Sequence, residues 1–252
     1  MILKLEEVTM RFGGFKAVDN VSLEVPEGAL VGLIGPNGAG KSTLFANITG
    51  FLPADRGRIW FADRRIDGLK PEARARLGLG RTFQVPREFS HLTVRENLAA
   101  SVPAQAGENL VDLYFRPGAV RRQEAEVAAA VDDMIAFLNL GAVADLSAGR
   151  LSGGQKKLLE LGRALLIKPK FVLLDEPFGG VNAVLIDEIS SRIRALNADG
   201  LGFLIVEHNL SALAELARDL FAMDNGRIIA HGTPDDVLAD PAVRRSYMGE
   251  KV

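Results

Sequence analysis

A glycine-rich stretch constrains this chain more than any other feature of its sequence. Residues 35–42 read Gly-Pro-Asn-Gly-Ala-Gly-Lys-Ser and fit the phosphate-binding pattern G-x-x-x-x-G-K-[ST] at every fixed position. An apolar run at residues 29–34 precedes the stretch, and Leu44, Phe45 and Ile48 follow it at helical spacing. A turn that only joined a strand to a helix would need neither the lysine nor the hydroxyl. The pattern therefore predicts a strand, a phosphate-binding loop and a helix, in that order.

The residue types in this loop suit a bound polyphosphate. Its glycines allow backbone N–H groups to approach the phosphates, and the start of the helix adds partial positive charge. Lys41 is expected to reach the terminal phosphates, and Ser42 to supply its hydroxyl to a magnesium ion. The residues expected to bind the nucleotide here are Asn37, Gly38, Ala39, Gly40, Lys41, Ser42 and Thr43.

Composition excludes several classes of protein. The chain has 252 residues, 48% of them hydrophobic and 25% charged, which is typical of a globular protein with a sizeable core. A net charge of -2 argues against nucleic-acid binding, and the absence of cysteine excludes disulfides and thiolate metal sites. No stretch approaches the roughly 20 apolar residues of a membrane span, and the N-terminus lacks a secretory signal. We therefore expect a cytoplasmic protein that reaches a membrane only through a partner.

The first third of the chain predicts an antiparallel β segment. Strands are expected at residues 2–12 and 21–25, and a hairpin at 57–61 and 64–66. Phe12 lies between the first two strands. It is a candidate platform for an adenine ring, but local sequence equally allows a core or turn aromatic.

The middle third predicts mainly helices. Pro71 opens a short helix whose arginines are expected on a solvated face, and a loop followed by a short helix is expected over residues 81–97. A longer helix with one apolar face is expected over residues 127–138. The sequence Leu-Ser-Gly-Gly-Gln at residues 151–155 runs directly into another helix. It favours either an anion site at the helix N-terminus or only a helix cap.

Two further buried strands end on polar residues. The run at 171–174 leads into Asp175 and Glu176, and the run at 203–206 leads into Glu207 and His208. Ligands of open α/β sheets bind at such carboxyl ends. Asp175 is expected to hold magnesium through water. Glu176 is expected to act as the base for a hydrolytic water. The alternative is a pair of solvated loop carboxylates. The histidine is a candidate for contacting the transferred phosphate.

The last part of the chain adds a hairpin and short helices. An amphipathic helix is expected over residues 185–196. Asn225-Gly226 predicts a type I′ turn between residues 221–223 and 228–230. Buried strands alternating with helices indicate an α/β fold with a mainly parallel sheet.

The order of these motifs resembles the ATP-binding subunit of an ABC transporter over essentially the full length of the chain. Residues 35–42 match the Walker A motif, Gln84 the Q-loop and Leu151–Gln155 the signature motif. Residues 171–176 match the Walker B motif with its following glutamate, and His208 matches the switch histidine. A signature motif placed upstream of Walker B is highly specific.

The resemblance implies a fold, two cofactors and a catalytic set. The expected fold is a P-loop NTPase core with an N-terminal antiparallel β subdomain, over residues 1–85 and 165–252, and an inserted helical subdomain over residues 86–164. The implied cofactors are ATP and Mg²⁺. Gln84 would contact the magnesium ion and the attacking water. The catalytic set is therefore Lys41, Gln84, Glu176 and His208, and the magnesium set is Ser42, Gln84 and Asp175.

The resemblance also implies partners. Two such subunits would face each other head to tail, so that the signature residues act on the nucleotide of the partner subunit. ATP hydrolysis would then drive a separate membrane permease, with the chain bound peripherally on the cytoplasmic face of the membrane and served indirectly by a substrate-binding protein. Phe83 and Phe89 are candidates for a groove that receives the permease. The signature residues concerned are Ser152, Gly153, Gly154 and Gln155.

Softer patterns narrow the resemblance. Residues 11–14, the segment between residues 96–98 and 121–122, and the ending at residues 246–250 look like subunits of branched-chain amino acid importers. Urea-type importers and lipopolysaccharide-export ATPases have closely similar subunits. A soluble ABC protein without a permease is disfavoured because the chain has one nucleotide-binding unit, and a P-loop kinase is disfavoured by the signature segment.

Three positions depart from the commonest pattern of the family. Gly-Gly-Val-Asn stands at residues 179–182, where many members have Ser-Ala-Leu-Asp, so Asn182 replaces an acid that links the two sites across the dimer. Asparagine keeps the hydrogen-bonding capacity but not the charge. Phe12 replaces a more frequent tyrosine, and Asn209 stands where aspartate is common.

Overall fold

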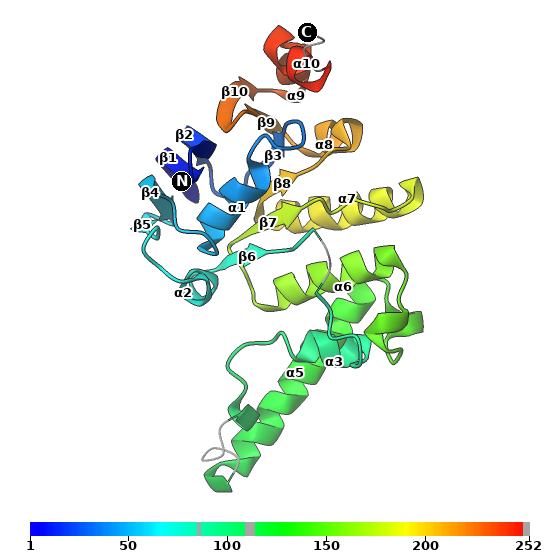
Figure 1. Ribbon diagram of the computed structural model, residues 1–252. Coiled ribbons are helices and arrows are strands. Elements are labelled where there is room, and N and C mark those ends of the chain that lie inside the picture. Colours follow the sequence, from blue (N-terminus) through cyan, green and yellow to red (C-terminus); the bar gives the residue numbers. More distant parts are fainter. Residues whose placement is uncertain (85–86, 109–113, 249–252) are drawn as a thin grey trace. The chain divides into compact units, whose positions relative to one another are not determined.

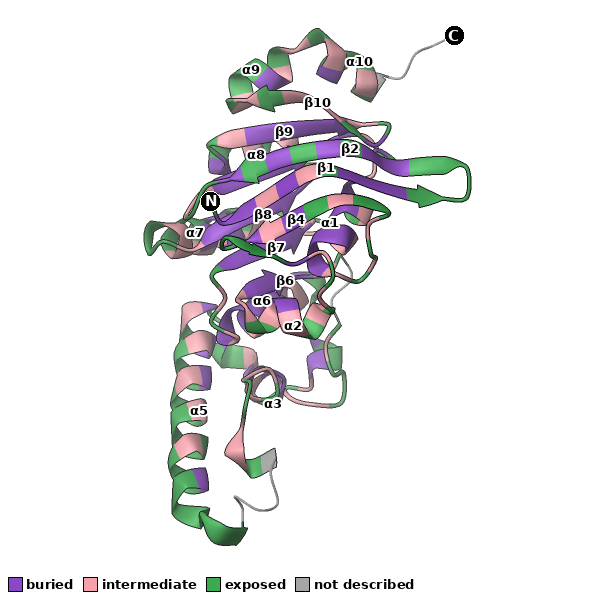
Figure 2. Ribbon diagram, turned by 90° about the vertical axis from the view of Figure 1, so that its left-hand side faces the viewer, coloured by how far each residue is buried: buried purple, intermediate pink, exposed green. Residues whose placement is uncertain are grey.

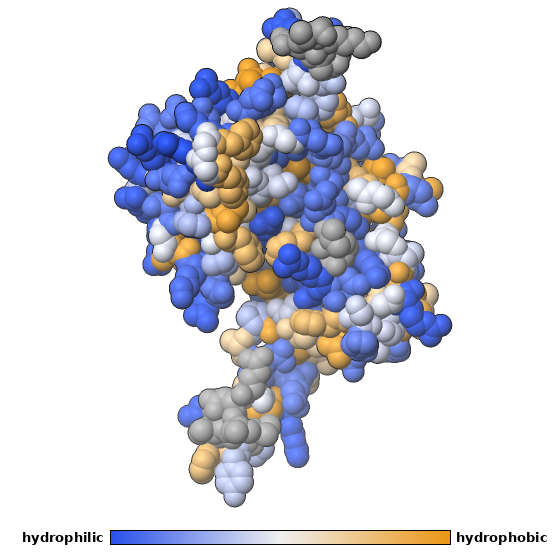
Figure 3. Space-filling model, viewed as in Figure 1, coloured by the Kyte–Doolittle hydropathy of each residue, from blue (hydrophilic) through white to orange (hydrophobic). Residues whose placement is uncertain are grey.

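The chain divides into two compact units, described in turn below. A computed structural model describes residues 1–84, 87–108 and 114–248 (Figure 1). The larger unit comprises Met1–Gln84 and Lys170–Val252, and the smaller unit comprises Val85–Pro169. Among the described residues, no helix is long and apolar enough to cross a bilayer. On the face shown in Figure 3, hydrophobic side chains gather in patches between hydrophilic ones.

A six-stranded sheet forms the centre of the larger unit. Its order is β10-β9-β3-β8-β7-β6, and all neighbouring pairs are parallel except β9 with β10 (Figure 1). Every residue of β3, β7 and β8 is buried, which explains their nearly continuous apolar sequences. The three predicted buried strands are thus confirmed. The bounds are β3 Leu30–Ile34, β6 Leu79–Arg81, β7 Phe171–Asp175, β8 Gly202–Val206, β9 Asp219–Asp224 and β10 Arg227–Gly232.

The helices of the larger unit begin and end at residues that the sequence marks. α1 starts directly after the glycine-rich loop and ends at Gly50, whose φ of 82° gives it a left-handed C-cap. Asn225 and Gly226, with φ of 45° and 79°, form the predicted left-handed turn between β9 and β10. The bounds are α1 Lys41–Thr49, α2 Pro71–Arg76, α7 Ala183–Ala198, α8 Leu210–Leu216, α9 Pro234–Ala239 and α10 Pro241–Met248.

A four-stranded antiparallel sheet, in the order β2-β1-β4-β5, completes the larger unit. Its strands are β1 Leu3–Phe12, β2 Phe15–Val25, β4 Arg56–Phe61 and β5 Arg64–Arg65. The second strand is longer than the sequence predicts, because it already pairs with β1 at Phe15. Buried residues of this sheet, purple in Figure 2, belong to one hydrophobic core with residues of α1 and the central sheet. Burial of each large apolar side chain contributes about 2 kcal/mol.

The expectation of a solvated arginine face on α2 is wrong for Arg74. Its side chain is only 1% exposed and donates hydrogen bonds to the carbonyls of Asn47, Ile48, Asp67 and Leu69 at 2.7 to 3.0 Å. Two of these carbonyls belong to the last turn of α1, where helix carbonyls have no partner within the helix. The guanidinium therefore caps the C-terminal end of the helix that follows the phosphate loop.

The smaller unit is helical. Its main helices pack through buried apolar side chains, and the approach of α6 to its neighbours needs Gly162, where a Cβ would lie 2.5 Å from Leu138. Thr93 and Glu96 form a capping box at the start of α3, so the predicted short helix at the end of residues 81–97 is confirmed; residues 85–86 lie outside the described residues. The bounds are α3 Val94–Ala99, η1 Ala106–Glu108, α5 Pro117–Phe137, η2 Gly141–Val143, η3 Ala148–Arg150 and α6 Gly153–Leu166.

Candidate active site

The glycine-rich loop between β3 and α1 lies tightly against the antiparallel sheet. Gly40, the N-cap of α1, has φ of 104°, and a Cβ there would lie 2.1 Å from the carbonyl oxygen of Ala17. Gly38 also has a left-handed φ, of 83°, but a Cβ there would meet no protein atom within 4 Å. One side of the loop is thus fixed by packing, and the other side faces open space.

That open space is a cavity of about 400 Å³ within the larger unit. It combines residues from five separate parts of the chain: the β1–β2 hairpin, the glycine-rich loop, and the loops after β6, β7 and β8. The predicted nucleotide-binding residues of the loop all line it. The lining residues are Phe12, Phe15, Ala17, Asn37, Gly38, Ala39, Gly40, Lys41, Ser42, Thr43, Gln84, Glu176 and His208.

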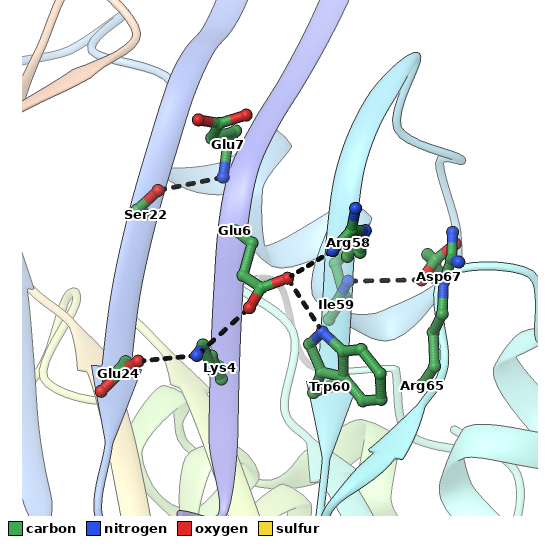
Figure 4. Close-up of polar contacts among 10 residues, drawn as sticks. All are labelled: Lys4, Glu6, Glu7, Ser22, Glu24, Arg58, Ile59, Trp60, Arg65 and Asp67. Carbon is green, nitrogen blue, oxygen red and sulfur yellow. Dashed lines mark hydrogen bonds and ion pairs between the residues drawn. The ribbon is translucent and has the colours of Figure 1, made fainter.

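A second cavity in the same unit, of about 840 Å³, is larger but chemically different. It lies over the antiparallel sheet, where Glu6 forms ion pairs with Lys4 and Arg58 and accepts a hydrogen bond from Trp60 (Figure 4). Lys4 also pairs with Glu24 on the neighbouring strand. These acidic and basic side chains satisfy one another, and the lining includes no residue of the phosphate loop. The smaller cavity is therefore the candidate site.

The ammonium group of Lys41 is held inside the loop. Its side chain is 6% exposed, and Nζ donates to the carbonyls of Gly35 at 2.6 Å and Pro36 at 2.9 Å. Burial lowers the pKa of this group, while the carboxylates of Glu176 and Asp175 act in the opposite direction. A cation fixed at the start of a helix provides a strong local attraction for phosphate.

Glu176 contacts Gln84 and His208, and the sequence predicts each of these three residues separately. One carboxylate oxygen accepts a hydrogen bond from Nε2 of Gln84 at 2.9 Å, and the other lies 2.9 Å from Nε2 of His208. The backbone of Glu176 has φ of 49°, a left-handed conformation that is uncommon for a residue with a side chain. The three side chains therefore form a connected polar group beside the phosphate loop.

Asp175, which the sequence assigns to magnesium, lies at the end of β7 and is 4% exposed. Its carboxylate forms an ion pair with Arg81 at 3.2 Å, and its N–H donates to the hydroxyl of Thr82. The guanidinium of Arg81 lies over the rings of Phe51 and Phe83, at 5.6 and 5.1 Å. Neither Arg81 nor Phe51 is identified by sequence reasoning, since no local pattern shows which strand will lie beside β7.

The predicted magnesium set consists of oxygen donors: a hydroxyl at Ser42, an amide at Gln84 and a carboxylate at Asp175. Among the described residues there is no group of three or more His, Cys, Asp or Glu side chains that could hold a metal ion by themselves. Few hard oxygen donors beside a phosphate-binding loop suit Mg²⁺, which keeps several waters and takes further ligands from phosphates. Ser42 and Gln84 line the cavity, whereas Asp175 does not, so the types of these donors fit the ion while the cavity brings only two of the three residues together.

Two aromatic rings border the cavity on the β1–β2 hairpin. Phe12 and Phe15 are cross-strand partners on either side of the Gly13-Gly14 turn, and they are 49% and 60% exposed. Phe12 is therefore not a core residue. Of the alternative that the sequence leaves open, a core or turn aromatic, the structure excludes the core position but not the turn position. Sequence reasoning misses the contribution of Phe15 and Ala17 to the cavity. The signal that could have shown it is the two-residue turn, which pairs the phenylalanines directly.

The predicted anion site at residues 151–155 belongs to the smaller unit. Ser152 is the N-cap of α6, and a capping box links its hydroxyl to the N–H of Gln155 and its own N–H to the side chain of Gln155. Gly153 and Gly154 form the first turn of the helix. The structure thus shows the helix-cap role of this segment, and the residues that line the cavity all belong to the larger unit.

The two asparagines that depart from the family pattern are helix caps. Oδ1 of Asn182 accepts the N–H of Leu185 at 3.0 Å at the start of α7. Oδ1 of Asn209 accepts the N–H of Ala212 at 3.1 Å at the start of α8. Asparagine and aspartate are about equally good at this position, so the caps do not depend on a charge.

Comparison with known families and proteins agrees with this geometry. The family model described as ABC transporter matches residues 18–179, and a model described as branched-chain amino acid ATP-binding cassette transporter matches residues 227–252. The chain is 41% identical to a probable branched-chain amino acid transport ATP-binding protein of Methanocaldococcus jannaschii, over 99% of this chain and 98% of the relative. It is 36% identical to a lipopolysaccharide export system ATP-binding protein of Acidithiobacillus ferridurans, over 93% and 91%.

Solved structures show the same architecture. A nucleotide-free ATP-binding cassette from an ABC transporter superimposes with a TM-score of 0.86 at 41% identity, covering 99% of both chains. An ATP-binding cassette of an ABC transporter in its ADP conformation gives a TM-score of 0.84 at 40% identity, again over 99% of both chains. The predicted α/β fold with a P-loop core is thereby confirmed.

Proposed function

Because this chain belongs to the ABC transporter family of ATP-hydrolysing subunits, we propose that it powers a separate membrane permease that imports branched-chain amino acids. The observation that carries the proposal is the convergence of the phosphate loop, Gln84, Glu176 and His208 on one cavity. Two comparisons support the choice of cargo. They are the matched C-terminal residues 227–252 and the branched-chain amino acid transport role in the name of the archaeal relative.

ATP binding is assigned to the loop and the hairpin. The backbone of residues 37–43 and the ammonium of Lys41 hold the phosphates, and the exposed rings of Phe12 and Phe15 offer surfaces for the adenine base. Ser42, Gln84 and Asp175 would hold Mg²⁺. Charge neutralisation between the β- and γ-phosphates is the chemistry that the bound ion supplies.

Hydrolysis is assigned to the polar group around Glu176. A water oxygen attacks the γ-phosphorus, the bond from this phosphorus to the β–γ bridging oxygen breaks, and the carboxylate of Glu176 accepts a proton from the water. Gln84 and His208 hold the two oxygens of this carboxylate, at 2.9 Å each. Their contacts orient the base, and His208, which lines the cavity, would also contact the transferred phosphate.

The proposal includes a second ATPase subunit, identical or related. The segment Ser152–Gln155 would act on the nucleotide of this partner, since the N-terminus of a helix carries partial positive charge that suits a phosphate. An ATP molecule between two subunits favours the closed dimer, and hydrolysis removes that bridge. Membrane association would come through the permease, to which a substrate-binding protein delivers cargo.

The competing assignment is lipopolysaccharide export, which appears in the name of the 36% identical relative. A urea importer is a further candidate of the same mechanism. Affinity purification of the tagged chain from membranes of its source organism distinguishes them, because the permease and binding protein that copurify can be sequenced. Uptake of radiolabelled leucine and urea by vesicles of the purified complex is the direct readout. Leucine uptake that needs ATP supports the proposal, whereas copurification of lipopolysaccharide-export components, or no permease at all, contradicts it.

A further inference from the structure

The loops after β7 and β8 are joined by one buried carboxylate that the hydrolytic mechanism does not use. Glu207 is 2% exposed. Its Oε1 accepts the N–H of Phe178 at 2.5 Å, on the loop after β7. Its Oε2 accepts the N–H of His208 at 3.0 Å and the N–H of Asn209 at 3.4 Å, on its own loop. Both oxygens are thus used, one for each loop.

The contact completes the backbone hydrogen bonding around the catalytic carboxylate. The N–H of Glu176 donates to a carbonyl at the end of β8, at 2.9 Å, and Pro177 has no N–H. The next N–H, of Phe178, donates to Glu207, and the N–H of Gly179 donates back to the carbonyl of Glu176 at 3.1 Å. Beyond the strand, the side chain of Glu207 therefore ties the backbone of this turn to the neighbouring strand end.

The turn needs such an anchor because its backbone is strained. The φ of 49° at Glu176 belongs to a region that costs about 1 kcal/mol or more for a residue other than glycine. Conformations of this kind persist only where the surrounding structure fixes them. Phe178, 4% exposed, packs in the interior while its N–H is held by Glu207, so the chain is fixed two residues beyond the strained position.

Acceptor capacity at both oxygens explains why a carboxylate occupies this place. Burial raises the pKa of Glu207, and the three backbone N–H groups oppose that effect. A carboxylate accepts at both oxygens, whereas glutamine accepts at one oxygen and presents an NH₂ group on the other side. Glutamine could therefore satisfy either Phe178 or the His208 loop, but not both.

We propose that Glu207 is a positioning residue for ATP hydrolysis, which holds the backbone of the Glu176 loop and of the His208 loop in one arrangement. The inference rests on the proposed function, because its effect is exerted through the base and the histidine. Nε2 of His208 lies 2.9 Å from the carboxylate of Glu176, so a shift of either loop would separate these two side chains. Displacements of about 1 Å at a reacting centre can lower a rate about 100-fold.

The first test compares Glu207→Gln with the unsubstituted full-length chain. The kcat for phosphate release from ATP is expected to fall about 10- to 100-fold, while the KM for ATP changes less than about threefold because the phosphate loop is untouched. Asp240→Asn is the matched control, since the carboxylate of Asp240 likewise accepts backbone N–H groups, from Ala242 at 2.6 Å and Val243 at 3.4 Å, at the start of α10. The control is expected to keep the parent kcat.

The second test separates positioning from general stability. In the Glu176→Gln background, Glu207→Gln is expected to change the residual single-turnover rate less than about twofold, because the base through which it acts is missing. A full additional 10-fold loss there, or a raised KM with unchanged kcat in the first test, overturns the proposal. Melting by circular dichroism checks folding. If the unsubstituted chain releases no phosphate from ATP, the proposed function itself fails. If the unsubstituted chain does release phosphate and Glu207→Gln has the same kcat, only the positioning role fails.

Discussion

At the scale of single residues, the carboxylate of Glu176 brings together parts of the chain that are far apart in sequence. Gln84 reaches it from the end of β6 and His208 from the end of β8, and both lie within 2.9 Å. The carboxyl ends of neighbouring parallel strands meet at one edge of the sheet, so their loops converge there. A base held by two partners loses little entropy when the reaction occurs.

Replacement of this base is the first prediction. Glu176→Gln is expected to lower the rate of phosphate release about 100-fold or more, because the amide cannot accept the proton of the attacking water. ATP binding is expected to persist, so the variant should accumulate as an ATP-bound dimer. Phosphate release and size-exclusion chromatography with light scattering in the presence of ATP measure both effects. Hydrolysis at the parent rate would show that another group is the base.

The second prediction concerns Lys41. Lys41→Ala is expected to reduce hydrolysis about 100-fold or more, since the buried ammonium that neutralises the terminal phosphates is removed. Lys70→Ala is the matched control because Lys70 is an exposed lysine at the start of α2 and does not line the cavity. Nucleotide affinity by isothermal titration calorimetry and phosphate release should both fall for the first variant. Equal activity of the two variants would refute the assignment of the loop.

At the scale of elements, the ends of the helices do much of the local positioning. α1 is fixed at its start by Gly40, which packs against β2, and at its end by Gly50 and the buried guanidinium of Arg74. α7 and α8, which follow the two catalytic loops, are each capped by an asparagine. Because the side chains of Arg74, Asn182 and Asn209 satisfy backbone groups that the helices leave without partners, they help to set where each helix begins or ends.

The third prediction addresses the cap at α7. Asn182→Ala is expected to lower the free energy of unfolding by about 1 kcal/mol, whereas Asn182→Asp should leave it within about 0.5 kcal/mol of the parent. Urea denaturation followed by circular dichroism measures both. Val184→Ala, at a 77% exposed position in the first turn of the same helix, is the control and should change little. An unchanged midpoint for Asn182→Ala would mean that the cap contributes no stability.

At the scale of the whole molecule, the functional residues are divided between the two units. The cavity with the phosphate loop lies in the larger unit, and Ser152–Gln155 starts a helix of the smaller one. Under the proposed function, the second group serves the nucleotide of a partner subunit. The two aromatic candidates for binding the permease also belong to different units. Phe83 contacts Phe51 in the larger unit, and the ring of Phe89 lies under the guanidinium of Arg163 in the smaller unit.

The fourth prediction tests whether each of these two aromatics takes part in binding the permease. Phe83→Asp and Phe89→Asp are expected to prevent copurification of the permease and to abolish ATP-driven uptake, because a charge would be buried in an apolar contact. Tyr114→Asp is the control, as Tyr114 is also an aromatic residue and is 83% exposed. Pull-down of the permease with each tagged variant, followed by vesicle transport, provides the readout. Normal assembly and transport by both phenylalanine variants would remove the groove from this position.

The sequence alone determined the features that depend on neighbours along the chain. Residues 35–42 define the phosphate loop because its chemistry needs a lysine and a hydroxyl at fixed spacing. The buried runs at β3, β7 and β8 show the parallel sheet because strands covered on both faces are apolar throughout. Asn225-Gly226 predicts the hairpin of β9 and β10 because a type I′ turn requires left-handed φ values, which these two residue types adopt readily.

Only the tertiary structure decided which distant residues support these features. Arg74 reads as a solvated helix residue, yet it is buried on the last turn of α1. Phe15 lines the cavity because β2 pairs with β1 at Phe12. Arg81 on β6 forms an ion pair with Asp175 on the neighbouring strand β7. Glu207, after β8, accepts a hydrogen bond from the loop after the parallel strand β7. Each contact depends on which strands lie side by side and in what register, and that is set by burial of the whole core, not by any local pattern.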